Sequence, residues 1–431
     1  MLISFSIENW QCFREKTVFS MVAGREKQHQ DRIANIDKYD FGVLPVSAIY
    51  GGNASGKTKF FNALAFAQRF VTKVTQPESS IPREYFKLDI ECALKPSIFT
   101  FELFLNEFCY EFSFAVTSEK VVEEKLVKIL SASEKVLYQR RDGKIEFPDD
   151  PTLKKDERLK FVAAGTRDNQ LFLTNAIDQK IEINYFQAVY GWFKHSLTLI
   201  GPNSNFPDLS EFFENSEMGD LLSQLDTGIA QLVTKEIPLE SIGILEHVKT
   251  RMMGDLPEGA IGRVNILNSD EPILIKKKDG AITAKKLISY HKSFEGETIQ
   301  FNWQDESHGT QRLINILPYF WDLWQKKSKK LYVIDELDRC LHTLLTRSLL
   351  DRYLASCSTE TRSQLIFTTH DVALMDQDLF RRDELWVAER DDAGCGSLIS
   401  FGEYKDVRAD KDIRKSYLQG RLGGIPNIFL E

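Results

Sequence analysis

The sequence lacks the features that mark membrane, secreted and metal-stapled proteins. Its longest apolar runs fall well short of the roughly 20 residues that a membrane-spanning helix needs. The amino-terminal MLISFSIENW has no basic segment ahead of its apolar residues, so it does not resemble a secretory signal. The six cysteines are scattered without paired spacing, which indicates neither a disulfide framework nor a zinc site. These absences predict a cytoplasmic protein that does not contact a membrane.

An excess of basic residues is also missing. The chain has 55 Lys and Arg against 63 Asp and Glu, which gives a formal charge of −8. This balance does not favour a protein whose main surface binds nucleic acid, although it leaves direct DNA binding through a local basic patch open. No sustained heptad array is present, so a long coiled-coil arm is not expected.

Apolar patterns near both ends of the 431-residue chain predict an α/β core. The run at 44–50 has the character of a buried strand, and the helical spacing of apolar residues at 57–71 follows it after a glycine-rich loop. Alternation over 98–117 predicts an antiparallel hairpin that turns at Asn106 and Glu107. From residue 299 onward, strands alternate with helices, as they do around a largely parallel sheet.

These patterns predict three segments. Residues 1–117 and 299–431 are expected to form the two halves of one mixed sheet flanked by helices. Between them, residues 118–298 show weaker alternation and several charged turns, so we expect a mainly helical insertion.

The strongest motif is GGNASGKT, which matches the phosphate-binding pattern G-x-x-x-x-G-K-[ST]. Its residues are Gly51, Gly52, Asn53, Ala54, Ser55, Gly56, Lys57 and Thr58. Glycines let the backbone amides wrap around phosphates at a helix amino terminus. Lys57 is expected to reach the β- and γ-phosphates of ATP, and Thr58 to ligate Mg²⁺. The alternative, a plain glycine-rich turn, fits less well because a strand precedes the motif and an amphipathic helix follows it.

A second motif, LYVIDE at 331–336, is an apolar strand that ends in two carboxylates. Asp335 is expected to join the Mg²⁺ shell, and Glu336 to orient or deprotonate the attacking water. Such a strand is common by itself, and the upstream phosphate loop is what favours the catalytic interpretation. The later strand 364–370 ends in His370. A histidine there is by default a capping or core residue, but in a parallel sheet it would lie near the γ-phosphate and could hydrogen-bond it.

Together these motifs resemble the ATPase head of ABC and SMC-like proteins. In that family a signature loop with the pattern Ser-x-Gly-x-Gln precedes the acidic strand by one helix, and ESHGTQR at 306–312 stands in that place. The resemblance implies a head-to-tail homodimer or higher oligomer in which Ser307 and Gly309 of one subunit close on the ATP bound by the other. It also implies that Asn9 and Arg14 lie near the adenine.

A narrower resemblance is to the stand-alone, OLD-like AAA-family ATPases of bacterial phage defence, of the RloA, abortive-infection, Septu- or retron-associated PtuA and PARIS AriA types. It is carried by LLSQLDTGI at 221–229, VIDELDRCLH at 333–342, TTHDVALMD at 368–376 and the tail YLQGRLGGIP. It implies a separately encoded effector, a nuclease, with or without a retron RNA or DNA. Only about sixty residues follow His370, which is short for a nuclease domain within this chain.

The leading hypothesis is therefore a Mg²⁺-dependent ATPase whose ATP-driven dimerisation controls that effector. Two alternatives remain: an ATP-gated scaffold or sensor with negligible turnover, and an SMC-like protein that tethers DNA. Departures from the family pattern leave the roles of Asp338 and His342 open, and 85–89 is only a candidate for the Q-loop of these heads.

Overall fold

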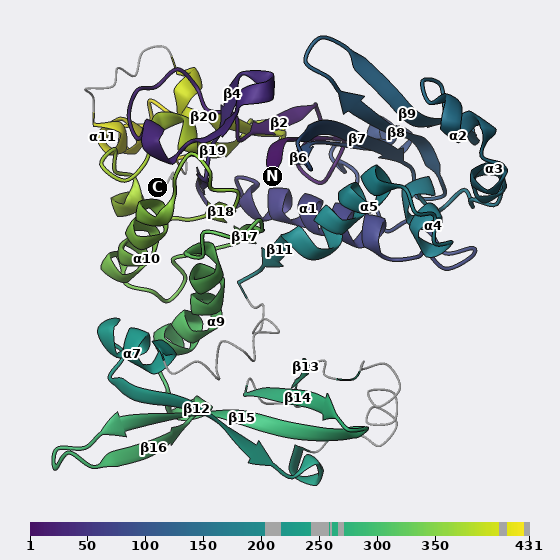
Figure 1. Ribbon diagram of the computed structural model, residues 1–431. Helices are drawn as coiled ribbons and strands as arrows, with labels where there is room; N and C mark the ends of the chain where they lie inside the picture. The colour runs from purple at the N-terminus through teal and green to yellow at the C-terminus, as the bar shows by residue number, and fades with distance from the viewer. Residues whose placement is uncertain (203–216, 243–257, 259–260, 266–270, 405–411, 426–431) are drawn as a thin grey trace. The chain divides into compact units, whose positions relative to one another are not determined.

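The chain folds into two compact units, each with its own β-sheet structure. The computed structural model describes all of the chain except residues 203–216, 243–257, 259–260, 266–270, 405–411 and 426–431. The first unit comprises residues 1–202, 323–338 and 350–431, and the second comprises residues 203–322 and 339–349. Figure 1 traces the elements of both units along the chain.

A six-stranded sheet in the first unit has the order β11-β17-β18-β5-β19-β20. Its strands are β5 (Val46–Tyr50), β11 (Leu197–Ile200), β17 (Leu331–Ile334), β18 (Gln364–Thr368), β19 (Leu385–Arg390) and β20 (Gly396–Ser400). Neighbours from β11 to β19 pair in parallel, and β20 pairs antiparallel with β19. Because carboxyl ends of parallel strands share one edge of a sheet, the segments that follow β5, β17, β18 and β19 meet at that edge.

A seven-stranded antiparallel sheet forms the other layer of this unit, in the order β10-β9-β8-β7-β6-β1-β2. Its strands are β1 (Leu2–Glu8), β2 (Thr17–Ser20), β6 (Ser97–Leu105), β7 (Phe108–Val116), β8 (Val121–Ile129), β9 (Glu134–Arg141) and β10 (Lys144–Glu146). Strands β6 and β7 pair Leu105 with Phe108 across the turn, as the alternation at 98–117 predicts. A small ribbon of β3 (Ala34–Ile36) and β4 (Phe41–Val43) lies apart from both sheets in the pairing pattern.

Helix α1 (Lys57–Thr72) supplies much of the core of the first unit. Its apolar residues recur at helical spacing, and Phe60, Leu64, Ala67 and Val71 are fully or almost fully buried. The ring of Phe60 lies 5.6 Å from that of Phe5 in β1, so the helix is fixed against the seven-stranded sheet. The amino terminus of α1 therefore has a rigid support.

The remaining helices of the first unit are short. They are α2 (Pro151–Lys155), α3 (Glu157–Ala164), α4 (Phe172–Asp178), α5 (Asn184–Gly191) and α11 (Ile413–Leu418). The longer helix α10 (Thr343–Ser356) precedes β18, and its residues 343–349 are counted in the second unit. Helices α4 and α5 lie beside α1 and cover the same side of the seven-stranded sheet (Figure 1). The prediction of a mixed sheet arrangement flanked by helices is confirmed.

The described residues of the second unit contain an antiparallel sheet of five strands, two further helices and the first half of α10. Its strands are β12 (Ile229–Ile237), β13 (Ile261–Asn265), β14 (Pro272–Lys278), β15 (Ala281–Lys292) and β16 (Thr298–Asn302). Strand β15 pairs with β12, β14 and β16, so it is the centre of the sheet. Helix α7 (Glu217–Gln224) precedes β12, and α9 (His308–Leu323) follows β16.

The prediction that residues 118–298 form a mainly helical insertion is wrong. Strands β8, β9 and β10 extend the seven-stranded sheet, β11 joins the six-stranded sheet, and β12 to β15 build most of the sheet of the second unit. The compact units also separate near residue 202 rather than 118. Strand β8 reads VVEEKLVKI, whose Glu, Lys and Leu favour helix in isolation. Pairing with β7 and β9 on both sides outweighs that preference, as tertiary context often does.

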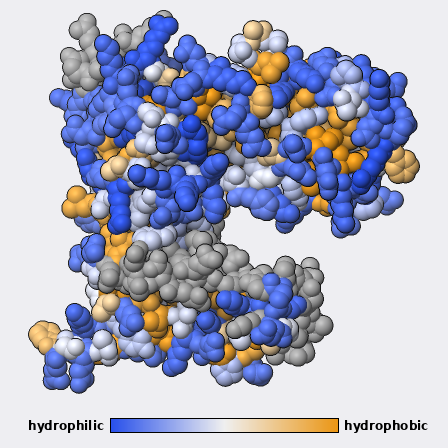
Figure 2. Space-filling view, in the orientation of Figure 1, coloured by the Kyte–Doolittle hydropathy of each residue, from blue (hydrophilic) through white to orange (hydrophobic). Residues whose placement is uncertain are grey.

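No helix among the described residues combines the length and the apolar character that crossing a membrane requires. The face shown in Figure 2 is largely hydrophilic, with apolar residues in scattered groups.

Candidate functional site

The glycine-rich loop joins β5 to α1, as the sequence motif predicts. Gly51 has φ 146° and Gly56 has φ 117°, which are backbone conformations that side chains disfavour. A Cβ on Gly51 would also lie 2.4 Å from the Ala388 carbonyl oxygen. The motif therefore needs glycine at both positions, and the loop leads directly into the amino terminus of a 16-residue helix. Such a terminus attracts anions through its unpaired amides.

Lys57 is held inside this loop rather than extended into solvent. Its Nζ donates hydrogen bonds to the carbonyl oxygens of Gly51 at 2.6 Å and Gly52 at 3.0 Å. Burial lowers the pKa of Lys57 to about 8, and the nearby carboxylates of Asp335 and Glu336 oppose that shift. Binding of an anion beside Nζ would compensate the desolvation of this ammonium group. The arrangement favours a phosphate as ligand.

The acidic end of β17 is organised by a hydroxyl group from the neighbouring strand. Asp335 is fully buried, and its Oδ1 accepts a hydrogen bond of 2.6 Å from the Thr368 hydroxyl. The same hydroxyl accepts a hydrogen bond of 2.8 Å from the Glu336 amide. One side chain of β18 thus orients both carboxylate residues. Thr368 was not among the predicted site residues, because its role depends on Asp335 and Glu336 of the neighbouring strand end, which are more than thirty positions away in sequence.

Glu336 has an unusual backbone conformation. Its φ is 51°, in the left-handed region that residues other than glycine rarely occupy. A conformation of this kind costs on the order of 1–3 kcal/mol and occurs preferentially at functional sites. The chain leaves the direction of the strand immediately after Asp335, so the two side chains differ in solvent exposure. Asp335 is fully buried, and Glu336 is partly exposed.

His370 follows β18 at the same edge of the sheet. Its amide donates a hydrogen bond of 3.3 Å to Oδ2 of Asp338, which gives Asp338 a role in holding the backbone at His370. Burial, together with the positive charge of Lys57, lowers the pKa of the His370 imidazole below its usual range. The ring is therefore mostly neutral near pH 7 and can donate or accept one hydrogen bond.

A cavity of about 190 Å³ joins these groups. Its lining brings residues of the phosphate loop together with Glu336 and His370, which follow Thr58 by 278 and 312 positions in sequence. The residues that line it are Cys12, Asn53, Ala54, Ser55, Gly56, Lys57, Thr58, Lys59, Glu336, His370 and Arg390. Cys12, Lys59 and Arg390 were not among the predicted site residues. Asp335 is fully buried and does not line this cavity itself.

The donor set fits Mg²⁺ that arrives with a nucleotide. Thr58 offers a hydroxyl and Asp335 a carboxylate, and hard oxygen ligands are those that Mg²⁺ prefers. Within the described part of the chain, no group of three or more His, Cys, Asp or Glu side chains could hold a metal ion by itself. Magnesium in nucleotide sites is usually held by few protein ligands together with phosphate oxygens, so a dedicated cage is not needed.

Two predicted nucleotide contacts near the amino terminus have other partners. The Asn9 side chain is buried and donates to the Cys92 carbonyl at 2.8 Å, while its oxygen accepts from the Phe86 amide at 3.1 Å. Arg14 forms an ion pair with Asp89 at 2.6 Å. Both side chains thus anchor residues 86–92, which include most of the candidate Q-loop, and Cys12 is the residue of this turn that lines the cavity.

The predicted signature residues belong to the second unit. Ser307 is exposed, and its Oγ accepts a hydrogen bond of 3.1 Å from the Thr310 amide, so it caps helix α9. A Cβ on Gly309 would lie 2.7 Å from the Cys340 carbonyl oxygen, which leaves room for glycine only. The loop is also anchored by Glu306, whose carboxylate contacts His291 of β15 at 2.7 Å.

Comparison with known proteins places the chain in a family. Residues 46–376, more than half of the chain, match the family described as "AAA domain, putative AbiEii toxin, Type IV TA system". The chain belongs to this AAA-domain family. Its P-loop and acidic strand both fall within the matched region, and membership of this AAA-domain family supports an ATP-binding P-loop ATPase. None of the curated proteins compared with this chain matches it.

Solved structures of SMC heads are among those that resemble this AAA-domain chain. One is the SMC head domain from Thermotoga maritima, at 13% identity and a TM-score of 0.33, covering 93% of this chain and 98% of that chain. Another is an SMC head bound to the C-winged helix domain of ScpA, at 11% identity and a TM-score of 0.38, covering 93% and 97%. At such low TM-scores the likeness adds nothing to the family match and the observed sheet order.

Proposed function

We propose that this chain binds ATP with Mg²⁺ in the cytoplasm and hydrolyses it at a site completed by a second copy of the chain. We further propose that the ATP-bound dimer controls a separately encoded effector, a nuclease, in antiviral defence. The observation that carries the catalytic part is the shared cavity, in which Lys57 and Thr58 of the phosphate loop face the same space as Glu336 and His370.

Each residue has a role that its surroundings support. Lys57 would contact the β- and γ-phosphates, because its ammonium group is already held within the phosphate loop by the carbonyl oxygens of Gly51 and Gly52. Thr58 and Asp335 would hold Mg²⁺, which when bound supplies positive charge to the phosphate oxygens. Glu336 would orient or deprotonate the attacking water. His370 would hydrogen-bond the γ-phosphate through its mostly neutral ring.

The signature loop supports the dimeric part of the proposal. Ser307 presents an exposed hydroxyl at the amino terminus of the 16-residue helix α9, where unpaired amides favour an anion. Gly309 lies in the same first turn, without a side chain to block approach of a phosphate. In the proposed dimer, this terminus would close on the γ-phosphate bound by Lys57 of the other subunit.

Replacing Lys57 with Ala should weaken ATP binding at least tenfold, because hydrogen bonds to charged groups contribute about 1.5–3 kcal/mol. Binding would be measured by titration with a fluorescent ATP analogue. Lys73→Ala, at the exposed far end of the same helix, removes the same charge without touching the loop and should bind as the wild type does. Equal binding by both variants would exclude the phosphate role of Lys57. ATP binding without phosphate release would instead identify a nucleotide-gated scaffold.

Replacing Ser307 with Arg should leave ATP binding to the monomer intact and lower dimer-dependent phosphate release at least tenfold, because a bulky cation would block the face that meets the partner's nucleotide. Gly309→Asp should also lower phosphate release, but its side chain would collide with the Cys340 carbonyl oxygen, so Ser307→Arg is the variant that separates the dimer contact from packing of the loop. Turnover would be measured as a function of protein concentration, with Ser131→Arg at another exposed serine as the control. Loss of ATP binding by the Ser307 variant would show that the loop is structural.

A further inference from the structure

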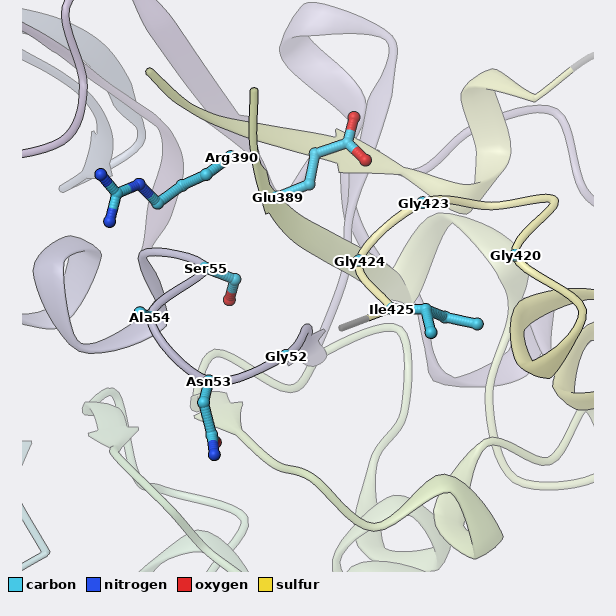
Figure 3. A pocket seen from close by; sticks show the side chains of 10 residues that line it. All are labelled: Gly52, Asn53, Ala54, Ser55, Glu389, Arg390, Gly420, Gly423, Gly424 and Ile425. Atoms are coloured by element: carbon cyan, nitrogen blue, oxygen red, sulfur yellow. The ribbon is translucent and has the colours of Figure 1, made fainter. Parts of the chain in front are cut away.

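The carboxyl-terminal region returns to the phosphate loop. Residues 420–425, here called the glycine strap, lie beside the loop in Figure 3. The Gly52 amide donates a hydrogen bond of 2.7 Å to the Gly424 carbonyl oxygen, and the Tyr417 hydroxyl donates to the same oxygen at 3.1 Å. The Tyr404 hydroxyl donates to the Leu422 carbonyl at 2.9 Å. The strap is thus bonded both to the loop and to the preceding chain.

Close packing against β19 explains why the strap contains adjacent glycines. Gly423 and Gly424 have φ values of 68° and 69°. A Cβ on Gly424 would lie 2.2 Å from Cγ2 of Val387, and one on Gly423 would lie 1.9 Å from a carboxylate oxygen of Glu389. A larger residue would therefore push the strap away from the sheet and from the phosphate loop. The collision at Gly424 is the more severe of the two, because the Glu389 carboxylate is the end of a flexible side chain and Val387 is a branched residue of the sheet.

Next to the contact between Gly52 and Gly424, the strap and the phosphate loop border a hollow of about 520 Å³. Residues 52–55 form one side of it, Glu389 and Arg390 another, and the strap the third (Figure 3). Arg390 and residues 53–55 also line the cavity that contains Lys57. Residues 53–55 of the loop therefore border both the cavity that contains Lys57 and the hollow beside the strap.

We propose that the glycine strap is a positioning element for the nucleotide site and that ATP binding in turn holds the strap in place. This inference rests on the proposed function, because it requires that the loop binds ATP. The peptide group between Gly51 and Gly52 connects the two: its N–H donates to the Gly424 carbonyl oxygen of the strap at 2.7 Å, and its carbonyl oxygen accepts the hydrogen bond from Lys57 at 2.6 Å. Release of the strap frees the peptide that holds Lys57, so the loop loses the shape in which its cation and amides face one phosphate.

Thermodynamic linkage makes this coupling reciprocal. If a docked strap strengthens ATP binding by some factor, bound ATP stabilises strap docking by the same factor. A partner protein that binds the strap in its released form would weaken ATP binding. A partner protein that binds only the docked strap would bind more tightly when ATP is present. Whether the strap is docked or released would thus depend on whether ATP is bound.

The first test uses the wild-type full-length chain and limited trypsin digestion. Arg421 is exposed, but the following Leu422 is 1% exposed, so cleavage between them requires the strap to lift. Mass spectrometry would follow this one cleavage. ATP with Mg²⁺ should slow it by about fivefold to 150-fold, the usual range for coupled sites, and should not slow it in Lys57→Ala. An unchanged rate in a wild-type chain that binds ATP would overturn the proposal.

The second test compares two glycines of the strap. Gly424→Ala should weaken ATP binding by about fivefold to 150-fold, because its methyl group would collide with Val387. Gly420→Ala is the matched control: its φ of 74° imposes a similar backbone penalty, but its methyl group would meet nothing within 4 Å. It should bind ATP within about twofold of the wild type.

Thermal unfolding without nucleotide would establish that both variants fold. Equal ATP affinities of the two folded variants would overturn the strap proposal while leaving the proposed function intact. Failure of the wild type to bind ATP would instead overturn the proposed function itself. If Gly424→Ala does not fold, the digestion of the wild-type chain decides the question alone.

Discussion

Replacing Glu336 with Gln is expected to lower the ATP turnover number by about 10²–10⁴-fold, the usual contribution of a general base. Gln has nearly the same shape as Glu and can keep the backbone hydrogen bond between residue 336 and Thr368, but it cannot take a proton from water. ATP binding should therefore be almost unchanged. The variant should accumulate as an ATP-bound dimer, because the step that releases the subunits is blocked.

Phosphate release and size-exclusion chromatography with ATP and Mg²⁺ would measure both effects. Glu360→Gln is a suitable control, since Glu360 is an exposed carboxylate in the turn before β18 and lies outside the cavity. Wild-type turnover by the Glu336 variant would show that another group activates the water. Loss of turnover without a dimer would retain the catalytic role of Glu336 and argue against the head-to-tail assembly.

Replacing Arg32 with Met is expected to lower the free energy of unfolding by about 3–5 kcal/mol, the usual cost of leaving one partner of a buried ion pair alone. The Arg32 guanidinium contacts the Glu384 carboxylate at 2.5 Å, and both side chains are almost completely buried. The pair joins the segment before β3 to the start of β19. Chemical denaturation would measure the loss, and Arg32→Met combined with Glu384→Gln should recover much of it by removing the lone charge.

The decrease in the free energy of unfolding caused by Arg32→Met should depend on pH. Burial raises the pKa of Glu384 to about 7, and Arg32 partly opposes this rise. A glutamic acid in an unfolded chain titrates near about 4.3, so the contribution of Glu384 to stability falls as pH rises from there to its folded pKa. Without Arg32 the folded pKa is higher still. The difference in the free energy of unfolding between wild type and Arg32→Met should therefore be larger at about pH 8.5 than at about pH 6. The same difference at both pH values would contradict the pairing of Arg32 with Glu384.

The sequence predicted best what is encoded locally. The phosphate loop is contiguous, so a strand, two glycines in special conformations and a helix start could be inferred from GGNASGKT alone. The hairpin of β6 and β7 was predictable for the same reason, because alternation and the turn at Asn106 are short-range signals. The ends of β17 and β18 could be expected to meet because both are buried strands in a parallel arrangement.

Features that depend on distant partners could not be predicted. Strand β8 has helix-favouring residues, and only its pairing with β7 and β9 makes it a strand. The glycines of the strap were visible in the sequence, but their contact with Gly52 joins positions separated by most of the chain. Thr368 is an ordinary strand residue until Asp335 and Glu336 are placed beside it.

The left-handed conformation of Glu336 has a consequence for evolution and engineering. A glycine at this position would relieve backbone strain, so selection for stability alone would remove the carboxylate that the proposed chemistry needs. Stability and turnover therefore make opposing demands at a single residue. A search for thermostable variants that ignores activity should drift toward glycine here, and such variants would be robust proteins that bind nucleotide without consuming it.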